Sequence, residues 1–245
     1  MESVERALDV LRVVAESGAL RLSDISRVLG LPHSSVHRLL ATLERRGYVA
    51  RAHGRSRLYI PGPALVDLGA SVADVTFPAA EPALRALAET CGETAHLITL
   101  RNTTAYFIGG IESRRALRVG LRVGSTLPAH CSSGGKALLA LLSPVTLEIM
   151  YPDERLPAVT DRSTTDRTTL FAELDAIRER GYAVNEAESE DDIRAIGAAV
   201  IDGHGRPRGA LAIAAPNNRL PDDDIPYIAA QIVGAAGQVG AALGR

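Results

Sequence analysis

Hydrogen-bonding side chains gather within five residues near the start of the chain. They are Ser34, Ser35, His37 and Arg38. None is acidic, a guanidinium group can donate two parallel hydrogen bonds to guanine, and small polar side chains can bond to other base edges or to phosphate. This combination predicts contact with double-stranded DNA. A helical hairpin with a solvated polar face is the alternative interpretation.

Two short helices must position these side chains. In the first, Ile25, Val28 and Leu29 recur at the spacing of one buried helical face. We expect Ser23 to cap its start, and Gly30 can take the left-handed conformation that ends a helix. Two helices joined by a short turn that contains glycine are typical of a helix-turn-helix.

The second helix carries the polar face. We expect Ser34 or Ser35 to cap it and Gly47 to end it. Its predicted buried residues are Val36, Leu39, Leu40 and Leu43. A supporting helix is expected over residues 4–17, ended by Gly18. Its predicted buried face is Val4, Ala7, Leu8, Leu11, Val14 and Ala15.

A basic hairpin follows. Residues 48–60 indicate two short strands around a turn, and Arg51, Arg55 and Arg57 on them can reach phosphate or the minor groove. Each arginine alone is equally well explained as a solvated surface residue. Residues 21–60 hold eight arginines and two acids in a chain of net charge −2, a distribution typical of phosphate binding. The predicted DNA-contacting residues are Arg21, Ser34, Ser35, His37, Arg38, Thr42, Arg51, Arg55 and Arg57.

The remainder of the chain predicts an antiparallel α+β domain covered by helices. A weakly amphipathic connector helix is expected over residues 64–75. Further helices are expected at 79–90, 137–142, 167–180 and 222–243. Strands are expected at 93–100, 106–111, 116–123, 182–185, 193–201 and 208–214.

Composition narrows the class of protein. A chain of 245 residues with 46% hydrophobic residues can form two domains with real cores. We find no secretory signal and no run near the roughly 20 apolar residues of a membrane span, so we expect a cytoplasmic protein with no membrane partner. Two cysteines, Cys91 and Cys131, exclude a disulfide framework. The histidines and cysteines lack metal-ligand spacing, so no metal or cofactor is expected.

Three short motifs suggest chemistry that their surroundings do not support. The Gly-Gly-Lys motif at 134–136 lacks the earlier glycine and the following Ser or Thr of a phosphate-binding loop. His130 and Cys131 are neighbours, which would point apart on an extended chain, and no third residue orients them. The three aspartates at 222–224 favour the positive end of a helix. Lys136, the only lysine, has no role assigned by these patterns.

Several stretches occur together in a characteristic order. They are SVERALDVL (3–11), GLPHSSVHRLL (30–40), GYV (47–49), LPAHCSSGGKALLA (127–140), IRERGYAV (177–184) and IRAIGAAV (193–200). Through them the chain resembles the isocitrate lyase regulator (IclR) family of bacterial transcription factors over nearly its whole length. The resemblance implies a winged helix-turn-helix DNA-binding domain (1–61), a connector helix (62–77) and a GAF-like effector-binding domain (78–245), assembled as dimers or tetramers.

The resemblance also implies an effector pocket. Its residues here would be Ala116, Val119, Ser132, Ser133, Gly134, Asn185, Ile193, Ala195, Ala212 and Ala214. Asn185 stands where carboxylate-binding members have an acidic residue, and alanines at 195, 212 and 214 stand where they have a cysteine and two serines. Fewer hydrogen-bonding groups imply a less polar effector, such as an aromatic or amide-bearing organic acid. Tight core packing explains the three alanines nearly as well.

These observations predict a ligand-responsive DNA-binding regulator. Its recognition helices would lie about one helical turn apart, roughly 34 Å, on a pseudo-palindromic operator. We expect the effector to act through the connector at 61–78, by binding two DNA-binding geometries with different affinities. The alternatives are an enzyme acting on a small molecule in the C-terminal domain and an oligomerisation module without a ligand. No acid, base or nucleophile constellation supports the enzyme.

Overall fold

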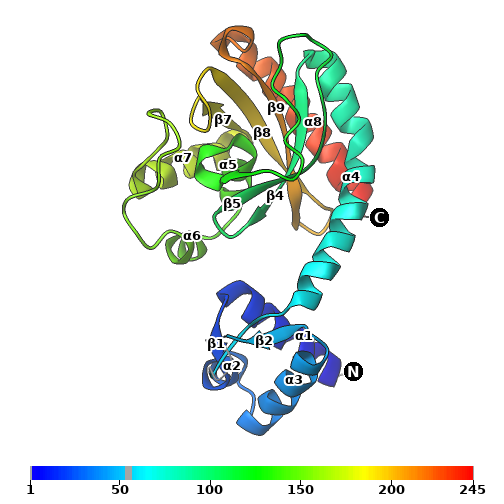
Figure 1. The fold of residues 1–245 in the computed structure, drawn as a ribbon, viewed down its shortest axis with the longest axis vertical. Coiled ribbons are helices and arrows are strands. Elements are labelled where there is room, and N and C mark those ends of the chain that lie inside the picture. The colour runs from blue at the N-terminus through cyan, green and yellow to red at the C-terminus, as the bar shows by residue number, and fades with distance from the viewer. Residues whose placement is uncertain (1, 53–56, 245) are drawn as a thin grey trace. The chain divides into compact units, whose positions relative to one another are not determined.

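The computed structural model describes residues 2–52 and 57–244 (Figure 1). The chain divides into two compact units, with the bounds Met1–Asp74 and Val75–Arg245. The division falls inside one helix, α4 (Pro63–Cys91), where the sequence predicted two. Pro78 and Pro82 lie within it, and the helix continues through both. An internal proline removes a single backbone hydrogen bond, which a helix of 29 residues can lose without ending.

The N-terminal unit is a winged helix-turn-helix, as predicted. Its elements are α1 (Glu2–Ser17), β1 (Leu20–Arg21), α2 (Leu22–Leu29), α3 (His33–Arg45), β2 (Val49–Arg51) and β3 (Leu58–Pro61). The strands are antiparallel in the order β1-β3-β2. Val36, Leu40 and Leu43 of α3 are buried in the core of this unit, which leaves the opposite face of the helix to the solvent.

The helix starts differ from the predicted caps. Ser23 lies inside α2, and the carboxylate of Asp24 accepts a hydrogen bond from the backbone N–H of Arg21 at 3.4 Å. Ser34 and Ser35 lie inside α3 because the helix already begins at His33, directly after a proline whose ring fixes φ. The predicted end of the first helix is confirmed, since Gly30 adopts φ +64°.

The predicted buried face of α1 is wrong in part. Val10, Val13 and Val14 are buried, whereas Val4 and Leu8 are 62% and 60% exposed. The helix carries two apolar stripes, and periodicity alone does not decide which one faces the core. The exposed stripe is therefore available to another surface.

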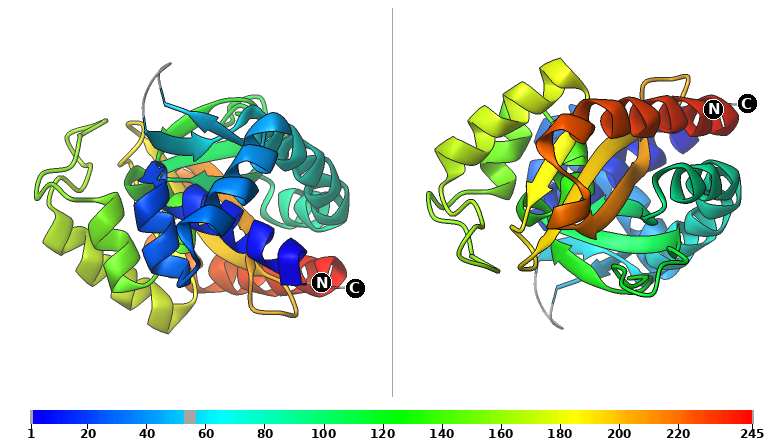
Figure 2. Two further views of the ribbon diagram at one scale, coloured as in Figure 1. Left: turned by 90° about the horizontal axis from the view of Figure 1, so that it is seen from below. Right: turned by 90° about the horizontal axis from the view of Figure 1, so that it is seen from above.

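The C-terminal unit is built on a six-stranded antiparallel sheet in the order β6-β5-β4-β9-β8-β7. The strands are β4 (Thr94–Arg101), β5 (Thr104–Ile111), β6 (Thr126–Pro128), β7 (Ala183–Glu186), β8 (Ile193–Ile201) and β9 (Pro207–Pro216). α8 (Ile225–Leu243) and the second half of α4 cover one face. α5 (Ser133–Leu139), α6 (Pro144–Met150) and α7 (Arg167–Arg180) cover the other (Figure 2).

Three local predictions in this unit are wrong. Residues 116–123 form no strand, because their apolar residues Leu117 and Leu121 point to solvent and the edge strand is β6 instead. Residues 129–131 form a 3-10 turn, so His130 and Cys131 do not lie on an extended chain. α5 begins four residues before its predicted start, with Ser132 as its cap, and α6 was not predicted.

α8 changes one inference from composition. With three preceding residues it is long and apolar enough to cross a membrane, contrary to the sequence expectation. Ile232 and Val239 nevertheless lie in the core formed with the sheet. One face of α8 therefore packs in this unit, with six of its 19 residues buried.

Candidate DNA-binding surface and effector site

α3 presents the predicted polar face. Ser34, His37, Arg38 and Thr42 are exposed, and Ser35 is half-buried. The hydroxyl of Thr42 donates to the backbone carbonyl of Arg38 at 3.0 Å, so this bond does not involve the Arg38 side chain. An exposed arginine near the start of a helix whose other face is buried has the geometry needed to enter a major groove.

The wing arginines fall into two groups. Arg51 is held by its own domain: its Nε lies 3.4 Å from Glu44 Oε1, and its guanidinium lies 4.2 Å from the ring centroid of Tyr59. Arg57 is exposed and directly precedes β3, and the exposed Arg21 pairs with Leu58, the first residue of that strand. Arg55 lies outside the described residues. Arg21 and Arg57 are therefore the described wing residues that are placed to reach a phosphate.

Several predicted effector residues come together on the sheet face that lies under α5. Asn185, Ala195 and Ala214 are directly opposite one another on β7, β8 and β9, and Thr94 of β4 continues the row. Ala212 is opposite both Gly197 and His96. We call Ala195, Ala212 and Ala214 the alanine face.

The start of α5 packs directly on this face. A Cβ atom at Gly197 would lie 2.8 Å from the backbone nitrogen of Gly134 and 2.9 Å from the carbonyl carbon of Ser133. Ser132 Oγ accepts from the backbone N–H of Gly135 at 3.3 Å. Glycine at 197 thus allows the predicted residues 132–134 to reach the sheet.

The two predicted residues of the loop after β5 differ. Val119 is buried, and its carbonyl accepts a hydrogen bond from Thr94 Oγ1 at 2.5 Å. Ala116 is exposed and lies apart from the others. Ile193 is half-buried, two residues before Ala195 on the same face of β8.

The side-chain amide of Asn185 is already engaged by the protein. Its Nδ2 donates to Cys131 O at 2.5 Å and to Ser189 Oγ at 3.1 Å, and its Oδ1 accepts from the Glu188 backbone at 3.1 Å. These bonds use both amide hydrogens and tie β7 to the start of α5. Asn185 therefore has a structural role, and its contact with an effector stays a prediction.

His96 is a polar residue of this face that sequence reasoning missed. It is 1% exposed, its ring meets Phe107 edge-on at 5.2 Å, and its Nε2 has no hydrogen-bond partner in the described chain. Desolvation, with a smaller effect of Arg122, lowers its pKa to about 4, so the ring is neutral at physiological pH. Strand alternation could have located His96, because it is two residues from Thr94 on β4.

The structure gives Lys136 its role. Its side chain is fully buried, and Nζ lies 2.6 Å from both Glu173 Oε1 and Glu188 Oε1. Burial raises the pKa of Glu188, and Lys136 opposes that rise. We call Lys136, Glu173 and Glu188 the ion triad. It is invisible in the sequence because its members are separated by 37 and 52 residues.

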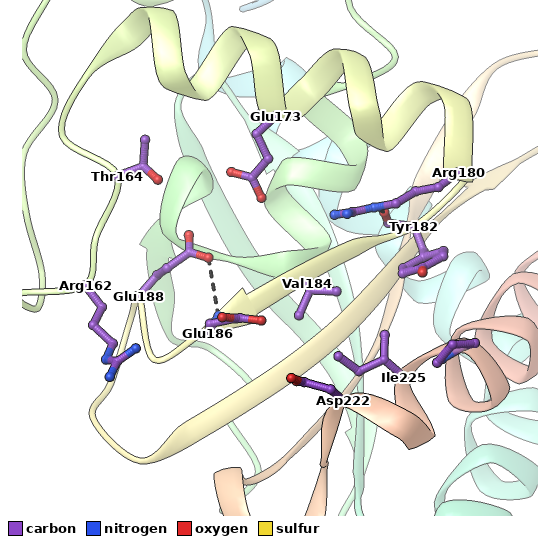
Figure 3. A pocket seen from close by; sticks show the side chains of 11 residues that line it. Arg162, Thr164, Glu173, Arg180, Tyr182, Val184, Glu186, Glu188, Asp222 and Ile225 are labelled. Carbon is purple, nitrogen blue, oxygen red and sulfur yellow. Dashed lines mark hydrogen bonds between the residues drawn. The ribbon is translucent and has the colours of Figure 1, made fainter.

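The two acids of the ion triad border a cleft of about 680 Å³. Figure 3 shows Glu173 extending from α7 toward the side of the cleft that also holds Glu188, while Arg180 and Tyr182 lie at the other end. Four acids and two arginines line the cleft, several of them already paired. We assign it no ligand.

Metal and nucleophile chemistry find no support in the described part of the chain. No group of three His, Cys, Asp or Glu side chains there is placed to hold a metal ion. Cys131 is buried, and burial raises the pKa of its thiol, which opposes formation of a reactive thiolate.

Comparison with known proteins adds independent findings. Residues 3–53 match the profile described as the IclR helix-turn-helix domain, and residues 71–241 match the C-terminal domain of bacterial IclR transcriptional regulators. The chain is 32% identical to the HTH-type transcriptional regulator BhcR of Paracoccus denitrificans, covering 96% of this chain and 85% of the relative. It is 30% identical to the transcriptional repressor IclR of Escherichia coli, covering 100% and 90%.

Solved structures agree. An IclR transcriptional regulator from Alicyclobacillus acidocaldarius superposes with a TM-score of 0.64 at 28% identity, covering 99% of this chain and 98% of the other. The repressor BlcR of Agobacterium tumefaciens gives a TM-score of 0.63 at 25% identity, covering 100% and 98%.

Proposed function

Because this chain belongs to the IclR family of bacterial transcriptional regulators, we propose a specific division of labour among its residues. At the level of the family, the protein is a DNA-binding transcriptional regulator with an effector domain, not an enzyme. Its partners are therefore an operator in double-stranded DNA and a small-molecule effector. Because a bacterial regulator must reach chromosomal DNA, we propose that the protein is cytoplasmic.

The exposed face of α3 is proposed to read base edges. Arg38 is assigned the bidentate contact to guanine, assisted by Ser34, Ser35, His37 and Thr42. The observation that carries this assignment is the burial of Val36, Leu40 and Leu43 on the other face, which fixes the direction of the polar side chains.

Phosphate contacts are assigned to the wing. Arg21 and Arg57 are exposed; Arg21 pairs with Leu58 in the sheet, and Arg57 directly precedes Leu58 along the chain. Arg55 keeps its predicted role, although it lies outside the described residues. Arg51 is proposed to contribute less, because release from Glu44 and Tyr59 would oppose its binding to DNA.

The effector is proposed to be a weakly polar organic acid, bound where residues 132–134, Val119, Asn185 and the alanine face meet. The alanine face offers apolar area and no hydroxyl or thiol group, which supports a ligand with an aromatic or amide-bearing body. His96 supplies a neutral ring nitrogen beside Ala212. Ala116 and Ile193 are proposed as outer contacts of the effector.

A homodimer is the proposed working unit. The N-terminal unit carries a groove of about 750 Å³, almost wholly apolar, between α1, α3 and the start of α4. Val4, Leu8 and Leu11 line it, and the first two are largely exposed. A second copy can cover the same patch on both partners, which is how two-fold symmetric dimers bury apolar surface. Two recognition helices would then address a pseudo-palindromic operator; a tetramer would pair two such dimers.

One binding experiment tests the base-reading assignment. Operator fragments are selected from the source genome, and binding is measured by fluorescence anisotropy with selected and scrambled duplexes. Arg38→Ala should weaken binding to the selected duplex by about 1–3 kcal/mol and spare the scrambled one. Arg85→Ala, an exposed arginine of α4 paired with Glu81, is the control. Equal losses on both duplexes would refute base reading by Arg38.

A further inference from the structure

A second cavity in the C-terminal unit shares no lining residue with the predicted effector site. It has a volume of about 430 Å³, within the range of small-molecule pockets. The turn between β4 and β5, strand β6, the 3-10 turn at 129–131 and the segment after α6 enclose it. Its walls combine threonine hydroxyls with apolar side chains such as Leu127, Met150 and Pro157.

His130 brings a buried hydrogen-bond acceptor to this wall. The residue is 1% exposed, and its Nε2 lies 3.0 Å from the carbonyl oxygen of Pro157. A carbonyl oxygen can only accept, so Nε2 carries the proton. Burial lowers the pKa of His130, which keeps the ring neutral and leaves a lone pair on Nδ1. Nδ1 has no partner among the described residues.

Tyr151 brings a second unpartnered group. It is 5% exposed, and its ring meets that of His130 edge-on with centroids 6.0 Å apart. Its hydroxyl has no hydrogen-bond partner in the described chain. Burial raises the pKa of Tyr151, so the hydroxyl keeps its proton and can both donate and accept.

Two residues that line this cavity, His130 and Tyr151, each hold a buried polar atom without a partner among the described residues, and each such atom costs free energy that a partner would recover. We propose that this cavity is a second ligand site, which takes an uncharged organic molecule with an apolar body and a hydroxyl group. Both polar atoms are covered in the free protein, so the ligand hydroxyl bonds to His130 Nδ1 or to the Tyr151 hydroxyl once those side chains turn toward the cavity, and the apolar body lies against Leu127 and Met150.

The charges around the cavity support an uncharged ligand. A carboxylate has no proton to donate to His130 Nδ1 and can bond only to the Tyr151 hydroxyl, whereas a ligand hydroxyl can bond to either group. Asp153 and Arg155 are the charged residues of the lining, and they are exposed and of opposite sign. They supply no net field that would favour an anion or a cation.

Phenol is a suitable probe, with toluene as its counterpart lacking the hydroxyl and benzoate as its charged counterpart. Binding is followed by thermal shift and by ligand-observed NMR on the full chain. We expect saturable binding of phenol, and binding of toluene and benzoate at least five-fold weaker, the usual effect of losing one hydrogen bond. Tyr151→Phe should weaken phenol binding about five- to ten-fold.

Two variants control this experiment. Tyr106→Phe removes the hydroxyl of a half-buried tyrosine that does not line the cavity, and it should bind phenol like the unaltered protein. Leu127→Trp should block the cavity. Without phenol, Tyr151→Phe should unfold at the same or a higher temperature, because the lost hydroxyl had no partner. Absence of saturable phenol binding, or equal binding by Tyr151→Phe, would overturn the proposal whatever the outcome of the DNA and effector assays.

Discussion

Replacing Lys136 with methionine isolates the energetic role of the ion triad. Methionine has a similar length and carries no charge, so the change removes the ammonium group and keeps most of the packing. Glu188 then remains as a carboxylate whose side chain is only 9% exposed, whereas the Glu173 side chain is 26% exposed and can be hydrated. The expected cost is therefore that of one uncompensated buried charge.

Breaking a buried ion pair by removing one partner costs about 3–5 kcal/mol, and protonation of Glu188 limits the loss to the lower end of that range. About 3 kcal/mol corresponds to a fall of roughly 6–12 °C in the unfolding temperature of a chain of this size. The double variant Lys136→Met with Glu188→Met should recover most of the loss, because apolar residues of similar volume can replace a buried ion pair.

The pH dependence gives a second measure. The pKa of Glu188 is raised in the folded protein, so the folded state binds this proton more tightly than the unfolded chain does. Removing Lys136 takes away the group that opposes this rise, so the folded pKa of Glu188 increases further. As the pH falls from 7 through that pKa toward the ordinary value of a glutamate, the folded variant gains stability relative to the unfolded chain. The deficit of Lys136→Met should therefore shrink at about pH 5.

Thermal unfolding of the full chain, followed by circular dichroism at both pH values, measures both effects. Unaltered protein, Lys136→Met, Glu188→Met and the double variant complete the cycle. Two results would contradict this role of the ion triad in holding α5 to the segment after β7. One is an unfolding temperature of Lys136→Met equal to that of the unaltered protein, and the other is a double variant less stable than Lys136→Met.

Three further outcomes are expected. Arg57→Ala should reduce the slope of log binding constant against log salt concentration by about one unit, as Arg55→Ala should. Arg85→Ala should leave this slope unchanged. An unchanged slope for Arg57→Ala would mean that Arg57 does not touch phosphate. Leu8→Glu should shift the dimer toward monomer in sedimentation velocity, whereas Val28→Glu, at a comparably exposed position outside the groove, should not; equal behaviour would remove the groove from the interface. Ala212→Ser with Ala214→Ser should increase operator release by compact carboxylates and decrease release by aromatic acids, and an unaltered preference would place the effector elsewhere.

The helix-turn-helix was predictable because its signals are local. Apolar residues spaced one turn apart indicate each short helix, and the left-handed Gly30 marks the end of α2. Neither signal depends on residues far away in the sequence. Exact starts were missed where Asp24 and a proline replaced the expected serine caps. The buried side of α1 was missed for another reason: two apolar stripes compete, and only the tertiary core chooses between them.

Several residues that the resemblance assigns to the effector site share one face of the sheet, and their binding of an effector stays a prediction. Cross-strand register places Asn185, Ala195 and Ala214 side by side on the consecutive strands β7, β8 and β9. The role of each side chain was not predictable. Nothing in the local sequence distinguishes Asn185, whose amide is fully engaged, from His96, whose Nε2 has no partner.

Hydrogen-bond partners separate two kinds of buried polar residue in this domain. Lys136 contacts two carboxylates and Asn185 bonds through both atoms of its amide, so they hold elements together. His96 and Tyr151 each keep a polar atom without a partner in the described chain, so they add a cost in the free protein that a bound molecule can remove. Apolar replacement should therefore lower the unfolding temperature at Lys136→Met and Asn185→Leu, and keep or raise it at His96→Phe and Tyr151→Phe. Thermal unfolding of the four variants gives the ranking directly, and the reverse order would show that His96 and Tyr151 are structural after all.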